Sequence, residues 1–110
     1  MAKTTPKDIE NLLNHDDWRV RRSAITKSCA DIANIDKALN DAHYAVRLAA
    51  IRHKKCSSVH IDKALYDDAC GVRLSAIWHP NVSTNNLEVA IYRGGYVGEV
   101  AKKIKIERNQ

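Results

Sequence analysis

Apolar residues recur along the chain at a fixed spacing of 26 residues. Shifting the sequence by this offset superimposes three pairs of residues in three successive copies. These pairs are Leu13-Asn14, Leu39-Asn40 and Leu65-Tyr66; Val20-Arg21, Val46-Arg47 and Val72-Arg73; and Ala24-Ile25, Ala50-Ile51 and Ala76-Ile77. Leu87 and Ala90 continue two further apolar columns into a fourth copy. Self-similarity at one period indicates a tandem structural repeat.

Each copy carries the signals of two short helices. Residues whose side-chain oxygen can cap a helix N-terminus stand at one repeat position, namely Thr5, Asp31, Ser57 and Ser83. They predict first helices at about 6–14, 32–40, 58–66 and 84–92. Further acids follow, and we expect them to cap the second helices; these acids are Asp16, Asp41, Asp67 and Asp68. The second helices are expected at about 17–28, 43–55, 69–79 and 96–106.

A pair of helices this short cannot bury its own apolar stripe, so successive pairs must stack and share a core. The predicted fold is all-α: a single domain over residues 1–110, built as an α-solenoid from copies at about 5–30, 31–56, 57–82 and 83–106. We expect Val20, Val46 and Val72 to lie along its interior. The fourth copy lacks the Val-Arg motif and bears Lys102 and Lys103, as expected of a degenerate terminal cap.

The segment 67–83, DDACGVRLSAIWHPNVS, resembles the leucine-rich repeat variant motif, a relative of HEAT-type repeats. The resemblance lies in an acid before Val-Arg, then Ala, then a junction with Asn and Pro. It implies a right-handed superhelix in which the first helix of each pair is either α or 3₁₀. Some members of that family carry an iron–sulfur cluster ahead of the repeats, but the three cysteines here lack a cluster-binding spacing.

Composition narrows the class of protein further. The chain is 45% hydrophobic and carries a formal charge of +5, of which residues 102–110 hold four basic side chains against one acid. No apolar run approaches the length of a membrane span, and the first residues lack a secretion signal, so we expect a cytoplasmic protein with no membrane partner. Three cysteines outside any Cys-x-x-Cys pattern argue against a disulfide framework or a zinc site.

Two sets of charged residues stand out. The first is a ladder at fixed repeat positions, in which arginines are expected to pair with loop acids: Arg21, Arg47 and Arg73 with Asp16, Asp41 and Asp67. The second lies in residues 18–30 and 43–56, the second segments of copies one and two, which contain no acid: Arg19, Arg22, Lys27, Arg52, Lys54 and Lys55. These six are either a binding stripe or a solvated face balanced by the loop acids.

An aromatic column accompanies the stripe, at Trp18, Tyr44, Cys70 and Tyr96. Stacked helices are about 8–10 Å apart, too far for consecutive stacked bases, so the column either packs between repeats or supplies anchors such as Trp18 and Tyr44 for a protein partner. His15, His43, His53, His60 and His79 form no metal pattern. No nucleophile–base pair or phosphate-binding loop is visible, so we expect no enzyme and no cofactor.

The leading hypothesis is therefore a non-enzymatic binding module, a protein–protein scaffold or a small inhibitor or accessory protein, whose basic face engages an acidic protein. The alternative is a protein that binds DNA or RNA phosphates through the same stripe and the C-terminal tail. The sequence leaves the oligomeric state open, with a monomer favoured.

Overall fold

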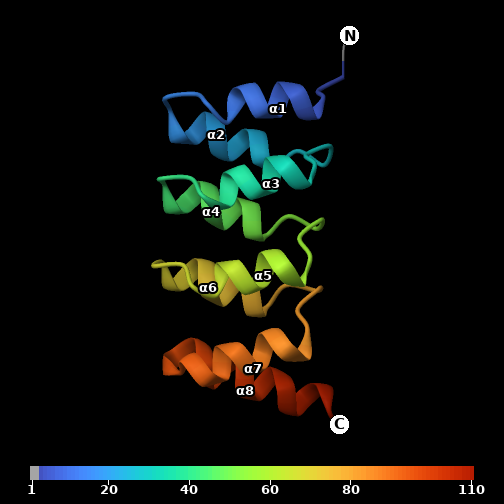
Figure 1. Ribbon diagram of the computed structural model, residues 1–110, viewed down its shortest axis with the longest axis vertical. Helices are drawn as coiled ribbons and strands as arrows, with labels where there is room; N and C mark the ends of the chain where they lie inside the picture. Colours follow the sequence, from blue (N-terminus) through green and yellow to red (C-terminus); the bar gives the residue numbers. More distant parts are fainter. Residues whose placement is uncertain (1–2) are drawn as a thin grey trace. The chain divides into compact units, whose positions relative to one another are not determined.

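The computed structural model describes residues 3–110, and within this range the chain consists of eight α-helices and no strands. The first helix of each copy is α-helical rather than 3₁₀. The helices, labelled in Figure 1, are α1 (Pro6–Leu12), α2 (Trp18–Ile25), α3 (Ile32–Leu39), α4 (Tyr44–Ile51), α5 (Ser58–Ala64), α6 (Cys70–Ile77), α7 (Thr84–Arg93) and α8 (Gly95–Arg108). No helix in the described range is long and apolar enough to span a membrane.

The first helices begin where the sequence predicts. Thr5, Asp31, Ser57 and Ser83 are the N-caps of α1, α3, α5 and α7. In all four, the cap side chain accepts a backbone N–H of the first turn, and the side chain three residues later accepts the N–H of the cap residue. These reciprocal bonds satisfy two donors that a helix start otherwise leaves open.

The predicted caps of the second helices are wrong by one or two residues. Asp17 and His43 cap α2 and α4, Ala69 precedes α6 without a side-chain cap, and Gly94 precedes α8. Asp41 instead accepts the N–H of His43 at 2.9 Å, which closes a turn in the loop before the helix. Asp67 does the same for Ala69 at 2.9 Å. The backbone carbonyls of Asp16 and Asp68, not their carboxylates, are the groups that the ladder arginines bind.

The chain divides into two compact units at a repeat boundary, Met1–Cys56 and Ser57–Gln110. In the first unit α1 packs on α3 and α2 packs on α4, so two helix pairs form two layers. In the second unit α5 packs on α7 and α6 on α8 in the same way. In Figure 1 each pair runs out along its first helix and back along its second.

The repeated apolar positions form the core of each unit. Ile9, Ile25, Ile35 and Ile51 are fully buried in the first unit, and Ile61, Leu65, Ile77 and Leu87 are buried in the second. Burying one such side chain contributes about 1.5–3 kcal/mol to folding. Val46 and Val72 are also fully buried, as expected, but Val20 is only partly buried, because it lines an open groove with Thr4 and Leu12.

Candidate functional site

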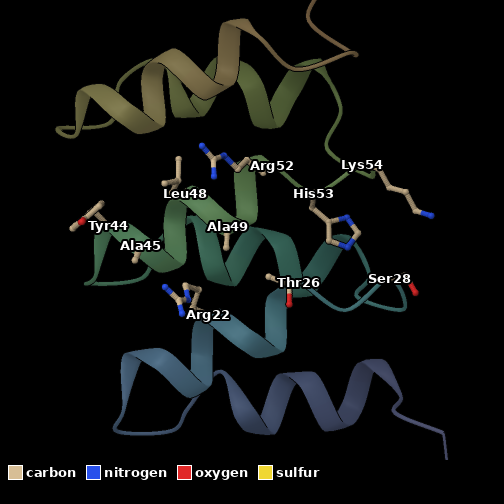
Figure 2. A pocket seen from close by; sticks show the side chains of 10 residues that line it. All are labelled: Arg22, Thr26, Ser28, Tyr44, Ala45, Leu48, Ala49, Arg52, His53 and Lys54. Carbon is tan, nitrogen blue, oxygen red and sulfur yellow. The ribbon is translucent and has the colours of Figure 1, made fainter.

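A groove of about 610 Å³ runs between α2 and α4 in the first unit. Its lining comes from two helices and the turns that follow them, as Figure 2 shows. The lining residues are Arg22, Thr26, Ser28, Tyr44, Ala45, Leu48, Ala49, Arg52, His53 and Lys54. None of these ten residues is acidic.

The groove combines apolar and cationic side chains. Ala45, Leu48 and Ala49 present methyl groups from three positions of α4, and all three are only partly buried. Arg22 and Arg52 extend from opposite sides of these residues, and both are exposed. Such a surface suits a ligand that carries both apolar and negatively charged groups.

A stack of rings fixes one end of the groove. The Trp18 and His43 rings lie 4.0 Å apart and nearly parallel, and the His43 ring stacks in turn on Tyr44 at 5.2 Å. The guanidinium of Arg22 lies over the Trp18 ring, 5.2 Å from its centroid, a cation–π contact. Tyr44 remains 56% exposed, so its outer face is available to a partner.

At the other end of the groove, the buried side chain of His53 bonds to two turns. His53 Nδ1 accepts the N–H of Lys55 at 3.1 Å, and Nε2 lies 3.0 Å from the Lys27 carbonyl. An acceptor opposite Nε2 requires that Nε2 carry the proton, so the hydrogen-bond network assigns the neutral tautomer. The Lys55 ammonium also donates to the Ala30 carbonyl at 2.7 Å. Together these bonds connect the turns after α2 and α4.

The structure divides the residues predicted to bind a partner. Four of them line the α2–α4 groove, namely Arg22, Arg52, Lys54 and Tyr44. Arg19 and Lys27 line a different groove beside α1, and Arg19 also pairs with Asp17 at 3.0 Å. Lys55 bonds across the turns, and Trp18 lies under Arg22. The six cations therefore do not all line one groove.

The arginine ladder joins adjacent copies. The Nε and Nη2 atoms of Arg21 donate to the two carboxylate oxygens of Asp41, in the following copy, at 2.8 and 3.1 Å. Burial of Asp41 acts to raise its pKa, but hydrogen bonds from Arg21 and from the N–H of His43 outweigh this and hold the pKa below its usual value. The hydrogen bonds that Arg21 donates to Asp41 raise the pKa of Arg21.

The same arginines also hold their own loops. Arg21 Nη1 donates to the carbonyls of His15 and Asp16, at 2.6 and 3.0 Å. Arg47 Nη1 binds the carbonyls of Asp41 and Ala42, and Arg73 Nη1 binds those of Asp67 and Asp68. In three copies, therefore, the Nη1 atom of the ladder arginine binds two backbone carbonyls of the loop that precedes its helix.

A second set of polar contacts between copies, which the sequence pattern did not predict, is made by buried asparagines. Asn34 is buried, completes the cap of α3, and donates from Nδ2 to the Pro6 carbonyl of the preceding copy at 3.2 Å. Asn86 repeats this in the second unit, donating to the Ser58 carbonyl at 3.1 Å. The signal was present, because polar residues recur at 26-residue spacing three positions after each cap.

The basic C-terminal segment is folded into α8. Lys102 pairs with Glu99 at 3.1 Å, and Lys105 pairs with Glu88 at 3.1 Å. Arg108 donates to the Val82 carbonyl at 2.7 Å. These three cations are therefore engaged within the second unit.

Among residues 3–110 no group of three or more His, Cys, Asp or Glu side chains is arranged to hold a metal ion. Comparison of the chain with protein-family models, with curated proteins and with solved structures found no match in any of the three.

Proposed function

We propose that this chain is a non-enzymatic binding module whose α2–α4 groove receives an acidic segment of another protein. The observation that carries the proposal is the composition of the groove: methyl groups from Ala45, Leu48 and Ala49 beside three cationic side chains, with no acid in the lining. Residues 1–56 hold eleven Lys or Arg against seven Asp or Glu, and residues 57–110 hold seven against six. The excess charge is thus concentrated in the unit that bears the groove.

A protein ligand fits this groove better than a nucleic acid. Phosphate binding calls for a continuous series of cations, and apolar methyl groups contribute nothing to it. Arg19 and Lys27 line another groove, while Lys102 and Lys105 have carboxylate partners. A peptide with apolar residues beside carboxylates would use both parts of the lining. DNA or RNA binding is therefore the second candidate, to be excluded by experiment.

We further propose that the two units form one right-handed solenoid of four repeats in the cytosol. The support is the repetition itself: capping boxes at four equivalent positions, two layers within each unit, and the same arginine–carbonyl bonds in three copies. The second unit carries Leu74, Trp78 and Cys70 where the groove has Leu48, Arg52 and Tyr44 one copy earlier. The cation Arg52 is therefore replaced by an aromatic residue in the following copy.

A library of short randomised peptides, panned against the full chain, tests the proposal. We expect enrichment of sequences that combine Asp or Glu with large apolar residues. Arg52→Glu should weaken their binding by about tenfold or more, as expected when a charge-assisted contact becomes repulsive. Lys63→Glu is the matched control, since Lys63 is exposed on α5 in the other unit.

Two outcomes would reject the assignment. The first is enrichment of acidic peptides that bind Arg52→Glu as well as the unchanged protein. The second is saturable binding of duplex DNA or RNA that weakens steeply with salt and is lost in Arg52→Glu, because that would establish a phosphate ligand for the groove.

A further inference from the structure

The ladder arginines have two hydrogen-bonding edges with different partners. In the first copy, Nη1 of Arg21 binds the loop carbonyls of His15 and Asp16, while Nε and Nη2 bind the carboxylate of Asp41 in the next copy. The second edge is a two-point carboxylate contact, the strongest form of this pair. The pair is largely buried, with side chains 16% and 9% exposed.

Arg73 binds the carbonyls of its own loop, as Arg21 does, but within the described part of the chain it makes no matching contact with a carboxylate. Its Nη1 binds the carbonyls of Asp67 and Asp68 at 2.7 and 3.0 Å, as Arg21 does in its own loop. At the next repeat position, 26 residues after Asp67, stands Arg93. Within residues 3–110, no carboxylate forms an ion pair with Arg73. Its Nε–Nη2 edge therefore lacks the partner that Arg21 has.

Arg73 also lines a pocket of about 230 Å³ in the second unit. Arg73 and Arg93 both line it, and the other lining residues are Leu65, Ala90, Gly94, Gly95 and Val97. The short turn at Gly94 and Gly95, both with positive φ, stands in place of the aspartate-bearing loop of the earlier copies. The lining contains no acid.

Arg93 is oriented by a ring. Its guanidinium lies over Tyr66, 4.2 Å from the ring centroid, which limits the positions open to its charge. Two guanidinium groups around one small pocket repel each other, and an anion between them would relieve that repulsion. The Arg21–Asp41 pair shows what the matching anion is for this arginine edge: a planar carboxylate.

We propose that this pocket binds a carboxylate supplied by a partner protein, as an Asp or Glu side chain or a chain terminus. The carboxylate makes the two-point contact with Arg73 that Asp41 makes with Arg21, and Arg93 contributes a second charge. The site lies in the second unit and shares no residue with the α2–α4 groove. An experiment can therefore refute one of the two proposals without refuting the other.

The test is an NMR titration of the full chain that follows the Nε–Hε signal of Arg73. The probes are sodium acetate and N-acetylaspartate, with sodium chloride at matched ionic strength as the blank and inorganic phosphate as a competing oxyanion. We expect saturable shifts of Arg73 with both carboxylates and none with chloride. Saturation by phosphate but not by the carboxylates would overturn the proposal, as would no saturable response to any of them.

Two variants separate this site from general charge attraction. Arg93→Asp should weaken the binding of N-acetylaspartate by about tenfold, since it replaces an attractive charge with a repulsive one. Lys103→Asp, an equal change of charge at an exposed position on α8, should leave it unchanged. Equal loss in the two variants, or no loss in Arg93→Asp, would refute a site at this pocket. Unchanged helicity by circular dichroism confirms that both variants are folded.

Discussion

At the scale of single residues, several side chains in this chain form hydrogen bonds with two different partners at once. Arg21 is the clearest case, because one edge closes its own loop and the other joins the next copy. The sequence predicts that these arginines pair with acids, but not that one edge of the guanidinium binds loop carbonyls while the other binds a carboxylate. This arrangement depends on the path of the loop, which brings the carbonyls of His15 and Asp16 to within 2.6 and 3.0 Å of the guanidinium.

Asp41 should make stability depend on pH in the acid range. Its pKa is lower in the folded chain than in the unfolded chain, where it is about 3.9. Its contribution is therefore present above that value and lost as the pH falls through the folded pKa. Asp41→Asn should lower Tm near neutral pH by about 4–8 °C, the shift that a loss near 1 kcal/mol produces in a small domain.

Thermal unfolding of both proteins from neutral pH to pH about 2.5 provides the check. The difference in Tm should shrink below the unfolded pKa of about 3.9. Some acid dependence will persist in the variant, because hydrogen bonds from Arg19 lower the pKa of Asp17 to about 2. A constant Tm difference over the whole range would contradict the assigned role.

Cys56 should be the least reactive of the three thiols. It is fully buried, its Sγ donates to the Ala50 carbonyl, and burial raises its pKa to about 11, whereas Cys70 is exposed. A pKa raised from about 8.5 leaves roughly two orders of magnitude less thiolate at about pH 8. Maleimide labelling followed by peptide mass spectrometry should modify Cys70 well before Cys56. Equal rates in the folded protein would contradict the burial.

At the scale of helices, the residue at which a first helix begins is determined by bonds within one helical turn. Some contacts of the same helix are made with a neighbouring copy. The cap positions Thr5, Asp31, Ser57 and Ser83 are correctly predicted because a cap bonds within one helical turn. Three of the second helices, α2, α4 and α6, begin one residue later than predicted, whereas α8 begins one residue earlier. Before α4 and α6, a turn at Asp41 or Asp67 is closed before the helix starts. Two adjacent candidate acids, such as Asp16 and Asp17, cannot be ranked from residue type alone.

Asn34 and Asp8 occupy equivalent capping positions and allow a matched comparison. Both accept the N–H of their cap residue, but only Asn34 is buried and bonds to the preceding copy. Loss of a capping contact costs about 1 kcal/mol, and a buried partner left unsatisfied adds about 1–3 kcal/mol. Asn34→Ala should therefore destabilise the chain more than Asp8→Ala in urea denaturation. Equal midpoints would show that the contact with Pro6 contributes nothing.

At the scale of the whole molecule, the period of 26 residues gives the helix count and the copy boundaries, and the division into units coincides with one such boundary.

The candidate site was predicted only in part. Arg22, Arg52, Lys54 and Tyr44 line one groove, but Leu48 and Ala49 were overlooked as site residues because an apolar residue in a helix is usually core. Arg19, Lys27 and Lys55 could not be separated from them without knowing the faces of α2 and the turns.

The proposed continuous solenoid should unfold as one cooperative structure. Trp18 lies in the first unit and Trp78 in the second, so Trp18→Phe and Trp78→Phe each leave a tryptophan that reports on one unit. Shared packing between neighbouring repeats predicts the same urea midpoint for the two fluorescence signals and for circular dichroism. Tryptophan midpoints that differ from each other, after correction for the stability of each variant, would contradict a single solenoid.

The most direct test of the proposed function is methyl NMR of the full chain, titrated with the acidic peptide that the library selects most strongly. Leu48, Ala45 and Ala49 should shift with a single dissociation constant, while Val20 in the groove beside α1 and Leu74 in the second unit stay unchanged. Saturable shifts at Val20 or Leu74 with Leu48 unmoved would show that the α2–α4 groove is not where the acidic segment binds.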